Sequence, residues 1–257
     1  MDNQYLNQFS GISRLMGHNV FNKLRSAHVT IIGLGGVGTW SAEAIARSGV
    51  GEITLIDLDD ICVTNTNRQL HALIDTVGKP KIEVLKDRLM KINPSLKVHC
   101  VLDFLTASTI EKILPKNSVV IDAIDSLGNK FVLATYCRQH AIPLIICGAA
   151  AGKQDPTQVR TGDLEKSVQD NLLTRLKKKL RNNADFPRTG PMGIYSVFSK
   201  ERAMYPTPEG GLCFKQELAD PSMAKMDCSE GMGSASLLTG TIGFAAAHLA
   251  LKCIAQK

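Results

Sequence analysis

The sequence predicts an α/β fold with a Rossmann-like, mostly parallel sheet and an irregular C-terminal extension. Short apolar runs rich in β-branched residues alternate with longer helix-compatible segments as far as residue 182. Residues 29–38, VTIIGLGGVG, join the first run to a helix through a glycine-rich turn. The second run, EITLID over 52–57, ends in an acid. Strand, glycine turn, helix, strand and acid in this order are typical of a nucleotide-binding unit.

The predicted elements follow a short helical lead-in over residues 1–26. Strands are predicted near residues 28–33, 52–57, 97–102, 118–123 and 143–148. Helices are predicted near residues 37–48, 79–92, 106–114, 128–140 and 163–182. Because strands alternate with helices, right-handed crossovers and a mostly parallel sheet are expected. Pro, Gly and polar residues dominate residues 183–233, which predicts loops and short strands there without a core of their own.

Three segments are predicted along the chain. Residues 1–160 form a nucleotide-binding core, residues 161–233 a basic helix and loops that face the substrate, and residues 234–257 an apolar helix on the core or in a dimer interface. The apolar run 234–254 is long enough to span a bilayer. Its small residues, His248 and Lys252 favour burial in protein, and membrane insertion or peripheral membrane association is the alternative.

The glycines of the first turn are each expected to serve the binding of a phosphate. Gly33 makes the tight turn, while Gly35 and Gly36 let backbone N–H groups approach the anion. Gly38 lets the helix pack closely on the strand. The N-terminus of the helix adds unpaired donors and partial positive charge. Asp57 stands where a carboxylate accepts hydrogen bonds from the ribose hydroxyls.

The residues after Asp57 predict ATP rather than a dinucleotide. A dinucleotide oxidoreductase has no need of cations directly after its ribose acid. An enzyme that transfers an adenylyl group needs cations for the triphosphate and a carboxylate for Mg²⁺. Arg68, Lys81 and Asp125 supply that set, and Asp125 follows a predicted strand at the ligand edge of the sheet. The further candidates for binding the nucleotide are Asp59, which is equally suited to holding a turn, Asn65 and Gln69.

Composition narrows the remaining possibilities. The chain has 257 residues, of which 44% are apolar, enough for a sizeable core. Its seven cysteines include no C-x-x-C pair, so no zinc site of the paired-cysteine kind is predicted, and the scatter suits reduced thiols in the cytoplasm. The polar N-terminus lacks the apolar stretch of a signal peptide. His18, His28 and His71 show no spacing typical of a metal site or a catalytic triad.

Positive charge is concentrated outside the predicted nucleotide fold. The formal net charge is +6, and residues 153–206 hold 11 Lys and Arg against 6 Asp and Glu. Within that segment the predicted helix carries the run R175-L-K-K-K-L-R181, whose candidate contacts are Lys177, Lys178, Lys179 and Arg181. They form either a solvated helix face or a patch for the phosphate backbone of RNA.

These motifs together resemble the E1-like adenylating superfamily, which includes ubiquitin-activating enzymes and the ThiF and MoeB activators of sulfur carriers. The matching set spans residues 10–150: G-x-G-G-V-G, the D-x-D after the second strand, N-x-x-R-Q, G-x-P-K, I-N-P and D-S. A narrower likeness covers almost the whole chain. Residues 10–17, 148–158 and 226–236 are similar to the family of tRNA threonylcarbamoyladenosine dehydratases.

The resemblance implies ATP-dependent cyclisation of threonylcarbamoyladenosine in tRNA through an acyl-adenylate, with Mg²⁺ held by Asp125. It implies a homodimer in which Arg14 reaches the neighbour's ATP. Gln8 replaces the family's first arginine. Cys228 lies in a Gly/Ser-rich stretch. In ubiquitin-activating relatives a cysteine receives the activated protein as a thioester, but this branch does not require that step, and an inert thiol is the alternative. A cysteine desulfurase and a sulfur acceptor are expected partners by the same resemblance, and a monovalent cation is left open.

Two other functions remain open from the sequence. One is a ThiF- or MoeB-like activator of a ubiquitin-fold sulfur carrier, which the missing zinc cysteines and the basic segment disfavour. The other is a nucleotide-binding adaptor in a sulfur relay with no turnover of its own. Release of pyrophosphate with modified tRNA, with a sulfur carrier or with neither distinguishes the three functions.

Overall fold

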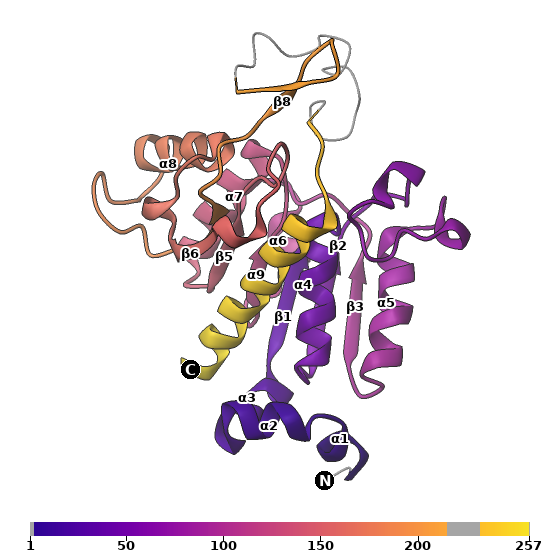
Figure 1. Ribbon diagram of the computed structural model, residues 1–257. Coiled ribbons are helices and arrows are strands. Elements are labelled where there is room, and N and C mark those ends of the chain that lie inside the picture. The colour runs from indigo at the N-terminus through magenta and orange to yellow at the C-terminus, as the bar shows by residue number, and fades with distance from the viewer. Residues whose placement is uncertain (1–2, 215–231, 257) are drawn as a thin grey trace.

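The computed structural model describes residues 3–214 and 232–256, and its centre is a sheet between two layers of helices (Figure 1). In the described part of the chain the sheet has seven strands in the order β3-β2-β1-β4-β5-β7-β6. Its strands are β1 His28–Ile32, β2 Glu52–Ile56, β3 Lys97–Val101, β4 Val119–Asp122, β5 Leu144–Cys147, β6 Val159–Asp163 and β7 Tyr195–Ser199. Every pair in it is parallel except β6 with β7. A short hairpin, β8 Tyr205–Pro206 and β9 Leu212–Cys213, lies outside it.

Helices cover both faces of this sheet. They are α1 Asn3–Gln8, α2 Ser10–Met16, α3 His18–Ser26, α4 Gly36–Arg47, α5 Lys81–Ile92, α6 Ile110–Ile113, α7 Leu127–Gln139, α8 Asn171–Asn183 and α9 Ser236–Gln256. Side chains of α4, α5 and α9 form one apolar core with one face of the sheet, and those of α6, α7 and α8 form a second core with the other face. The mostly parallel α/β sheet predicted from the sequence is therefore confirmed.

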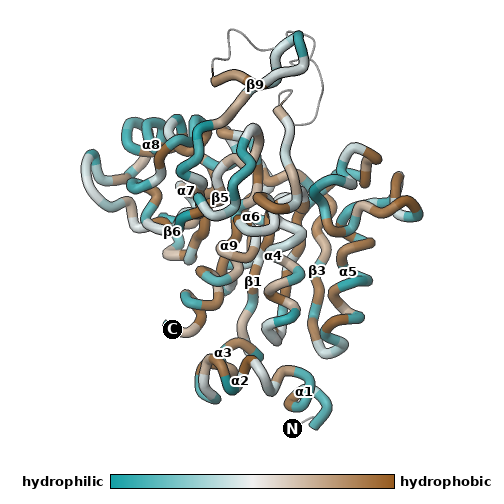
Figure 2. Tube along the Cα trace, viewed as in Figure 1, coloured by the Kyte–Doolittle hydropathy of each residue, from teal (hydrophilic) through white to brown (hydrophobic). Residues whose placement is uncertain are grey.

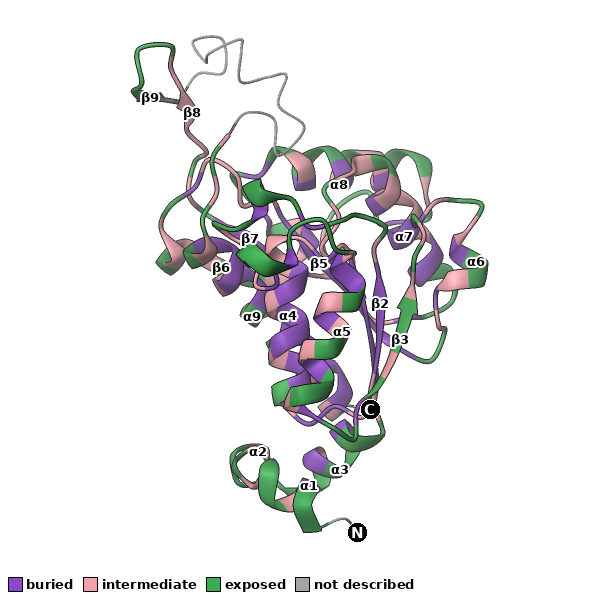
Figure 3. Ribbon diagram, turned by 90° about the vertical axis from the view of Figure 1, so that its right-hand side faces the viewer, coloured by how far each residue is buried: buried purple, intermediate pink, exposed green. Residues whose placement is uncertain are grey.

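The two cores follow from the alternation of side chains along each strand. In β1, Val29 and Ile31 belong to the core under α4 and α9, whereas Ile32 belongs to the core under α7 and α8. All residues of β1 are buried, as expected for a strand covered on both faces. Burial differs among the helices, since α4 is mostly buried whereas α1–α3 are largely exposed (Figure 3).

The C-terminal helix α9 lies directly on α4. The Oγ of Ser41 donates to the carbonyl of Gly243 at 3.0 Å, and a Cβ on Gly243 would stand 2.7 Å from the carbonyl oxygen of Val37. Helix α9 is the described helix with the length and hydropathy of a membrane span, yet 61% of its most apolar window is buried inside the protein. Its apolar residues are therefore used in large part for packing on the core.

Two strands extend the sheet beyond the sequence prediction. Strand β7 lies in the segment predicted to hold loops and short strands, and it pairs with β5 and joins the unpredicted strand β6 to the sheet. Helix α8 begins at Asn171 rather than near residue 163, because the Asp170 side chain accepts the N–H of Leu173 and caps it there. Residue 161, the predicted start of the extension, lies inside β6.

Candidate nucleotide-binding site

The glycine turn leaves β1 at the carboxyl end of the sheet and begins α4. Gly33 has a φ of +85°, which only glycine adopts without strain, and Gly35 caps α4. A Cβ on Gly38 would stand 1.9 Å from the carbonyl oxygen of Gly33. Glycine is thus required sterically at both positions. The first N–H groups of α4 have no partner within the helix and are available to an anion.

Asp57 follows β2 and binds the glycine turn directly. Its Oδ2 accepts the backbone N–H of Leu34 at 2.5 Å, and its Oδ1 accepts the N–H of Asp59 at 2.8 Å. Burial raises the pKa of Asp57, while these N–H groups and the nearby Lys81 act to lower it. Each carboxylate oxygen keeps a further lone pair, so the group retains the capacity to accept a ribose hydroxyl.

Lys81 and Asp59 form an ion pair beside this acid. Lys81 is the first residue of α5 and is buried, and its Nζ lies 2.6 Å from Oδ2 of the exposed Asp59. The backbone N–H of Lys81 also donates to the carbonyl of Asp59. Asp59 therefore holds the lysine and its own turn, which is one of the two roles that the sequence left open.

The N-x-x-R-Q segment docks on α4. The carbonyl of Arg68 accepts the indole N–H of Trp40 at 3.1 Å, and its guanidinium donates to the carbonyl of Thr64 at 2.9 Å. Asn65 is buried and accepts the N–H of Cys62, so it stabilises the loop. Gln69 is buried near the turn, and its Oε1 has no partner among the described residues.

Asp125 lies on the loop that leaves β4, at the same end of the sheet. The start of this loop touches the glycine turn, because the N–H of Ala123 donates to Ile32 at 2.9 Å and a Cβ on Gly33 would stand 2.9 Å from the carbonyl oxygen of Ala123. Asp125 is exposed, and Ser126 rather than Asp125 caps α7. An exposed carboxylate fits the preference of Mg²⁺ for oxygen ligands.

A buried ion pair beneath this loop was not identified from the sequence. Lys130 Nζ lies 3.0 Å from Oδ1 of Asp122, and both side chains are fully buried. Asp122 is the last residue of β4, and its Oδ1 also accepts the N–H of Ile124. Its place three residues before Asp125, in D-A-I-D, was the available signal. The pair joins α7 to the end of the strand.

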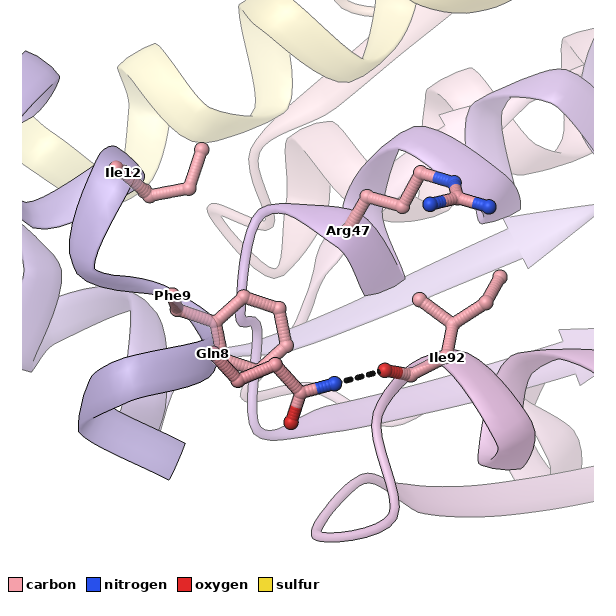
Figure 4. A pocket seen from close by; sticks show the side chains of 6 residues that line it. Gln8, Phe9, Ile12, Arg47 and Ile92 are labelled. Carbon is pink, nitrogen blue, oxygen red and sulfur yellow. Dashed lines mark hydrogen bonds between the residues drawn. The ribbon is translucent and has the colours of Figure 1, made fainter. Parts of the chain in front are cut away.

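Arg14 is not brought to this site. It is exposed on α2, and α1–α3 lie at the amino ends of the strands, opposite the glycine turn (Figure 1). Gln8 donates to the carbonyl of Ile92, and both residues line a pocket of about 240 Å³ between α1, α2 and the ends of α4 and α5 (Figure 4). That pocket is therefore remote from the glycine turn.

The cations of α8 do not all face solvent. Lys177 donates to a backbone carbonyl at 2.6 Å, the Lys179 ammonium lies 4.6 Å from the centre of the Phe131 ring, and Arg181 donates to a loop carbonyl at 3.1 Å. Lys178 is exposed. Helix α8 is nevertheless strongly hydrophilic along its outer side (Figure 2).

Two further points from the sequence concern Cys228 and metal-binding groups. Cys228 lies outside the described residues. Within residues 3–214 and 232–256, no group of three or more His, Cys, Asp and Glu residues is arranged to hold a metal ion.

Comparison with known proteins relates almost the entire chain to one protein family. The family model described as the ThiF family matches residues 5–257. A tRNA threonylcarbamoyladenosine dehydratase of Escherichia coli K12 is 44% identical over 97% of this chain and 94% of its own length. The namesake enzyme of Haemophilus influenzae is 40% identical over 98% and 95%.

One of the similar solved structures contains a bound nucleotide. The E. coli dehydratase TcdA in complex with ATP superposes with a TM-score of 0.83 at 40% identity, covering 98% of this chain and 96% of that one. The chain therefore belongs to the ThiF family, together with the tRNA threonylcarbamoyladenosine dehydratases that it matches from end to end.

Proposed function

We propose that this protein is an ATP-dependent tRNA threonylcarbamoyladenosine dehydratase. The observation that carries the proposal is the 44% identity to an enzyme of that name over 97% of the chain. The glycine turn, Asp57, Lys81 and Arg68 support the nucleotide-binding part independently, because they lie on segments that meet at the carboxyl end of the sheet. A cytoplasmic location follows from a tRNA substrate.

The reaction proceeds in two steps. A carboxylate oxygen of the threonyl group attacks the α-phosphorus of ATP, and the bond to pyrophosphate breaks. The carbamoyl oxygen then attacks the activated carbonyl carbon and expels AMP, while a carbamoyl nitrogen loses its proton. The nucleoside thereby loses one water, whose oxygen leaves with AMP. Adenylation is needed because a carboxylate is a poor electrophile and AMP is a good leaving group.

Each site residue has a role in this proposal. Backbone N–H groups at Gly35 and Gly36 bind phosphate, and Asp57 accepts a ribose hydroxyl. Arg68 and Lys81 stabilise the charge that develops on the phosphates, with Asn65 and Gln69 completing the loop around the nucleotide. Mg²⁺ held by Asp125 would neutralise triphosphate charge when bound. A monovalent cation is a further candidate cofactor.

The proposal includes two macromolecular contacts. The exposed Arg14 of one subunit reaches the ATP of a second subunit, since it lies at the wrong end of its own sheet. The segment that begins at residue 161 faces the tRNA, with the exposed Lys178 as a contact and Lys177, Lys179 and Arg181 contributing charge from the same helix. A cysteine desulfurase and a sulfur acceptor are further candidate partners.

Release of pyrophosphate from ATP tests the function directly. Purified protein is incubated with tRNA that carries threonylcarbamoyladenosine, with the same tRNA lacking the modification, or with a ubiquitin-fold sulfur carrier. We expect release with modified tRNA and conversion of its nucleoside to the cyclic form. Release with the sulfur carrier alone would support activation of that carrier, and release with none of them would support the adaptor.

A further inference from the structure

The two peptide groups that flank Leu34 in the glycine turn are each held by a side chain. Leu34 is fully buried and lies between Gly33 and Gly35. Its N–H donates to Oδ2 of Asp57 at 2.5 Å, and its carbonyl oxygen lies 3.1 Å from Nε2 of His71. Because a carbonyl only accepts hydrogen bonds, Nε2 of His71 is assigned the proton.

The surroundings of His71 keep its ring neutral and direct it to this one contact. The residue is 1% exposed, and burial lowers the pKa of His71 to about 4, an effect to which the nearby Lys81 adds. Its Nδ1 has no hydrogen-bonding partner among the described residues. The backbone of His71 is fixed separately, because its carbonyl accepts the hydroxyl of Thr76 at 2.6 Å.

A clamp is needed at Leu34 because its neighbours are flexible. Glycine at 33 and 35 lets the two peptide planes that flank Leu34 rotate at little steric cost. The Leu34 carbonyl shares its plane with the N–H of Gly35, which caps α4, so the contact with His71 fixes the direction in which that N–H points. A turn that is already ordered before the ligand arrives loses less conformational entropy on binding.

We propose that His71 is a positioning residue of the nucleotide site, which together with Asp57 clamps the two peptide groups that flank Leu34, so that the glycine turn presents its N–H groups to the phosphates of ATP. The inference rests on the proposed binding of ATP at this turn. His71 touches neither substrate nor cofactor in this role, since it acts through the Leu34 carbonyl.

Two substitutions separate the donor from the bulk of the ring. His71→Leu removes the N–H and leaves the buried Leu34 carbonyl unpaired, whereas His71→Gln places an amide N–H the same number of bonds from the backbone. Isothermal titration with ATP should show affinity lowered about tenfold or more in His71→Leu and restored to within about threefold of wild type in His71→Gln. In steady-state assays the KM for ATP should rise in His71→Leu more than kcat falls.

His28 provides the matched control. It is also a buried histidine with one side-chain hydrogen bond, to Thr54 Oγ1 at 2.8 Å, but it lies at the amino end of β1. His28→Leu should lower the melting temperature without changing the affinity for ATP. If His71→Leu does not fold, His71→Asn serves as the second variant that lacks a donor at the Nε2 position.

Several results would overturn the clamp. One is ATP affinity at the wild-type level in His71→Leu or His71→Asn. Another is an equal loss of affinity in His71→Gln or in His28→Leu, because either would indicate general destabilisation. Wild-type protein that fails to bind ATP refutes the proposed function and the clamp with it, so the two failures are distinguishable.

Discussion

At the carboxyl ends of the strands, buried charged side chains hold the loops, whereas at the amino ends α1–α3 meet the sheet largely through apolar contacts. The first set includes the pairs Lys81–Asp59 and Lys130–Asp122. The second includes the packed rings of Tyr5, Phe9 and Phe21. Burying charge is costly even when the charge is paired. The buried pairs beside the glycine turn therefore favour that end of the sheet as the one at which a charged ligand binds.

The largest effect that separates the two ends should come from Asp125. Asp125→Ala removes the proposed Mg²⁺ ligand and leaves triphosphate charge uncompensated, so turnover should nearly vanish. Pyrophosphate release with modified tRNA measures it. Asp87→Ala, which removes an exposed acid from α5, is the control and should keep wild-type activity. Wild-type turnover in Asp125→Ala would remove this residue from the mechanism.

A second test asks whether Arg14, at the amino ends of the strands in one subunit, acts at the nucleotide site of another subunit. Arg14→Ala and Asp125→Ala should each be inactive alone, but mixed chains should regain activity because one site in each heterodimer holds both groups. Subunit exchange is verified first with differently tagged chains. No rescue after confirmed exchange would mean that Arg14 acts within its own chain or has no part in catalysis.

Arg68 should follow with a smaller loss. Arg68→Ala should slow turnover on the order of 10²-fold, comparable to the loss of one oxyanion-hole donor. The backbone contact of Arg68 with Trp40 stays intact in this variant, so the fold should be kept. Single-turnover formation of AMP measures the rate. Arg138→Ala, on α7, controls for the loss of a cation elsewhere.

The basic helix should contribute less than the nucleotide site. Reversing the charge of Lys177, Lys178, Lys179 and Arg181 together should weaken binding of modified tRNA and leave the affinity for ATP unchanged. Because Lys177 and Arg181 also donate to backbone carbonyls, Lys178→Glu alone is the variant that leaves the helix contacts intact. Unchanged tRNA affinity at both low and high salt would identify α8 as a solvated surface.

The last prediction concerns the dependence of stability on pH rather than turnover or binding. The folded pKa of His71 is about 4, below its unfolded value near 6.5, so the unfolded chain binds the proton first as the pH falls. Stability is therefore lost between about pH 6.5 and pH 4, by up to about 3 kcal/mol for this residue. Urea unfolding of wild type and His71→Gln at pH 7 and pH 4.5 tests it. An identical pH dependence in both proteins would contradict it.

His28 sharpens the comparison between the two ends. Burial also lowers the pKa of His28, although the neighbouring Glu52 opposes the shift. The sign of its contribution is therefore the same as that of His71, and stability again falls as the pH drops. His28→Gln should reduce the pH dependence without any effect on ATP binding, because this ring lies at the amino end of the sheet.

The sequence predicted the parallel core well because its signals are local. Alternating apolar strands and amphipathic helices, with glycine where a positive φ or a close approach is required, placed β1 to β5 near their observed bounds. Short strands were predicted for the segment that holds β7, but its bounds were not, since YSVFS is short, mixed in polarity and surrounded by Pro and Gly. Its place between β5 and β6 depends on long-range pairing that no short window shows.

The candidate site was predicted in the same uneven way. Asp57, Lys81 and Gly38 were named from motifs, and the structure places them around one turn. Lys130 was not named and His71 was given no role, because a single histidine or lysine carries no spacing signal of its own. Their importance arises only from what they face after folding.

The sequence by itself determined the glycine turn, the order of strands and helices through α7, and the residue types suited to ATP, because backbone sterics and periodic burial act over a few residues. The tertiary structure decided which polar groups are buried together. It set Lys130 against Asp122, His71 against the Leu34 carbonyl, and Arg14 at the far end of its own sheet. Such pairings join residues that are distant in sequence or face different elements, and they become fixed only when the sheet and its helices have packed.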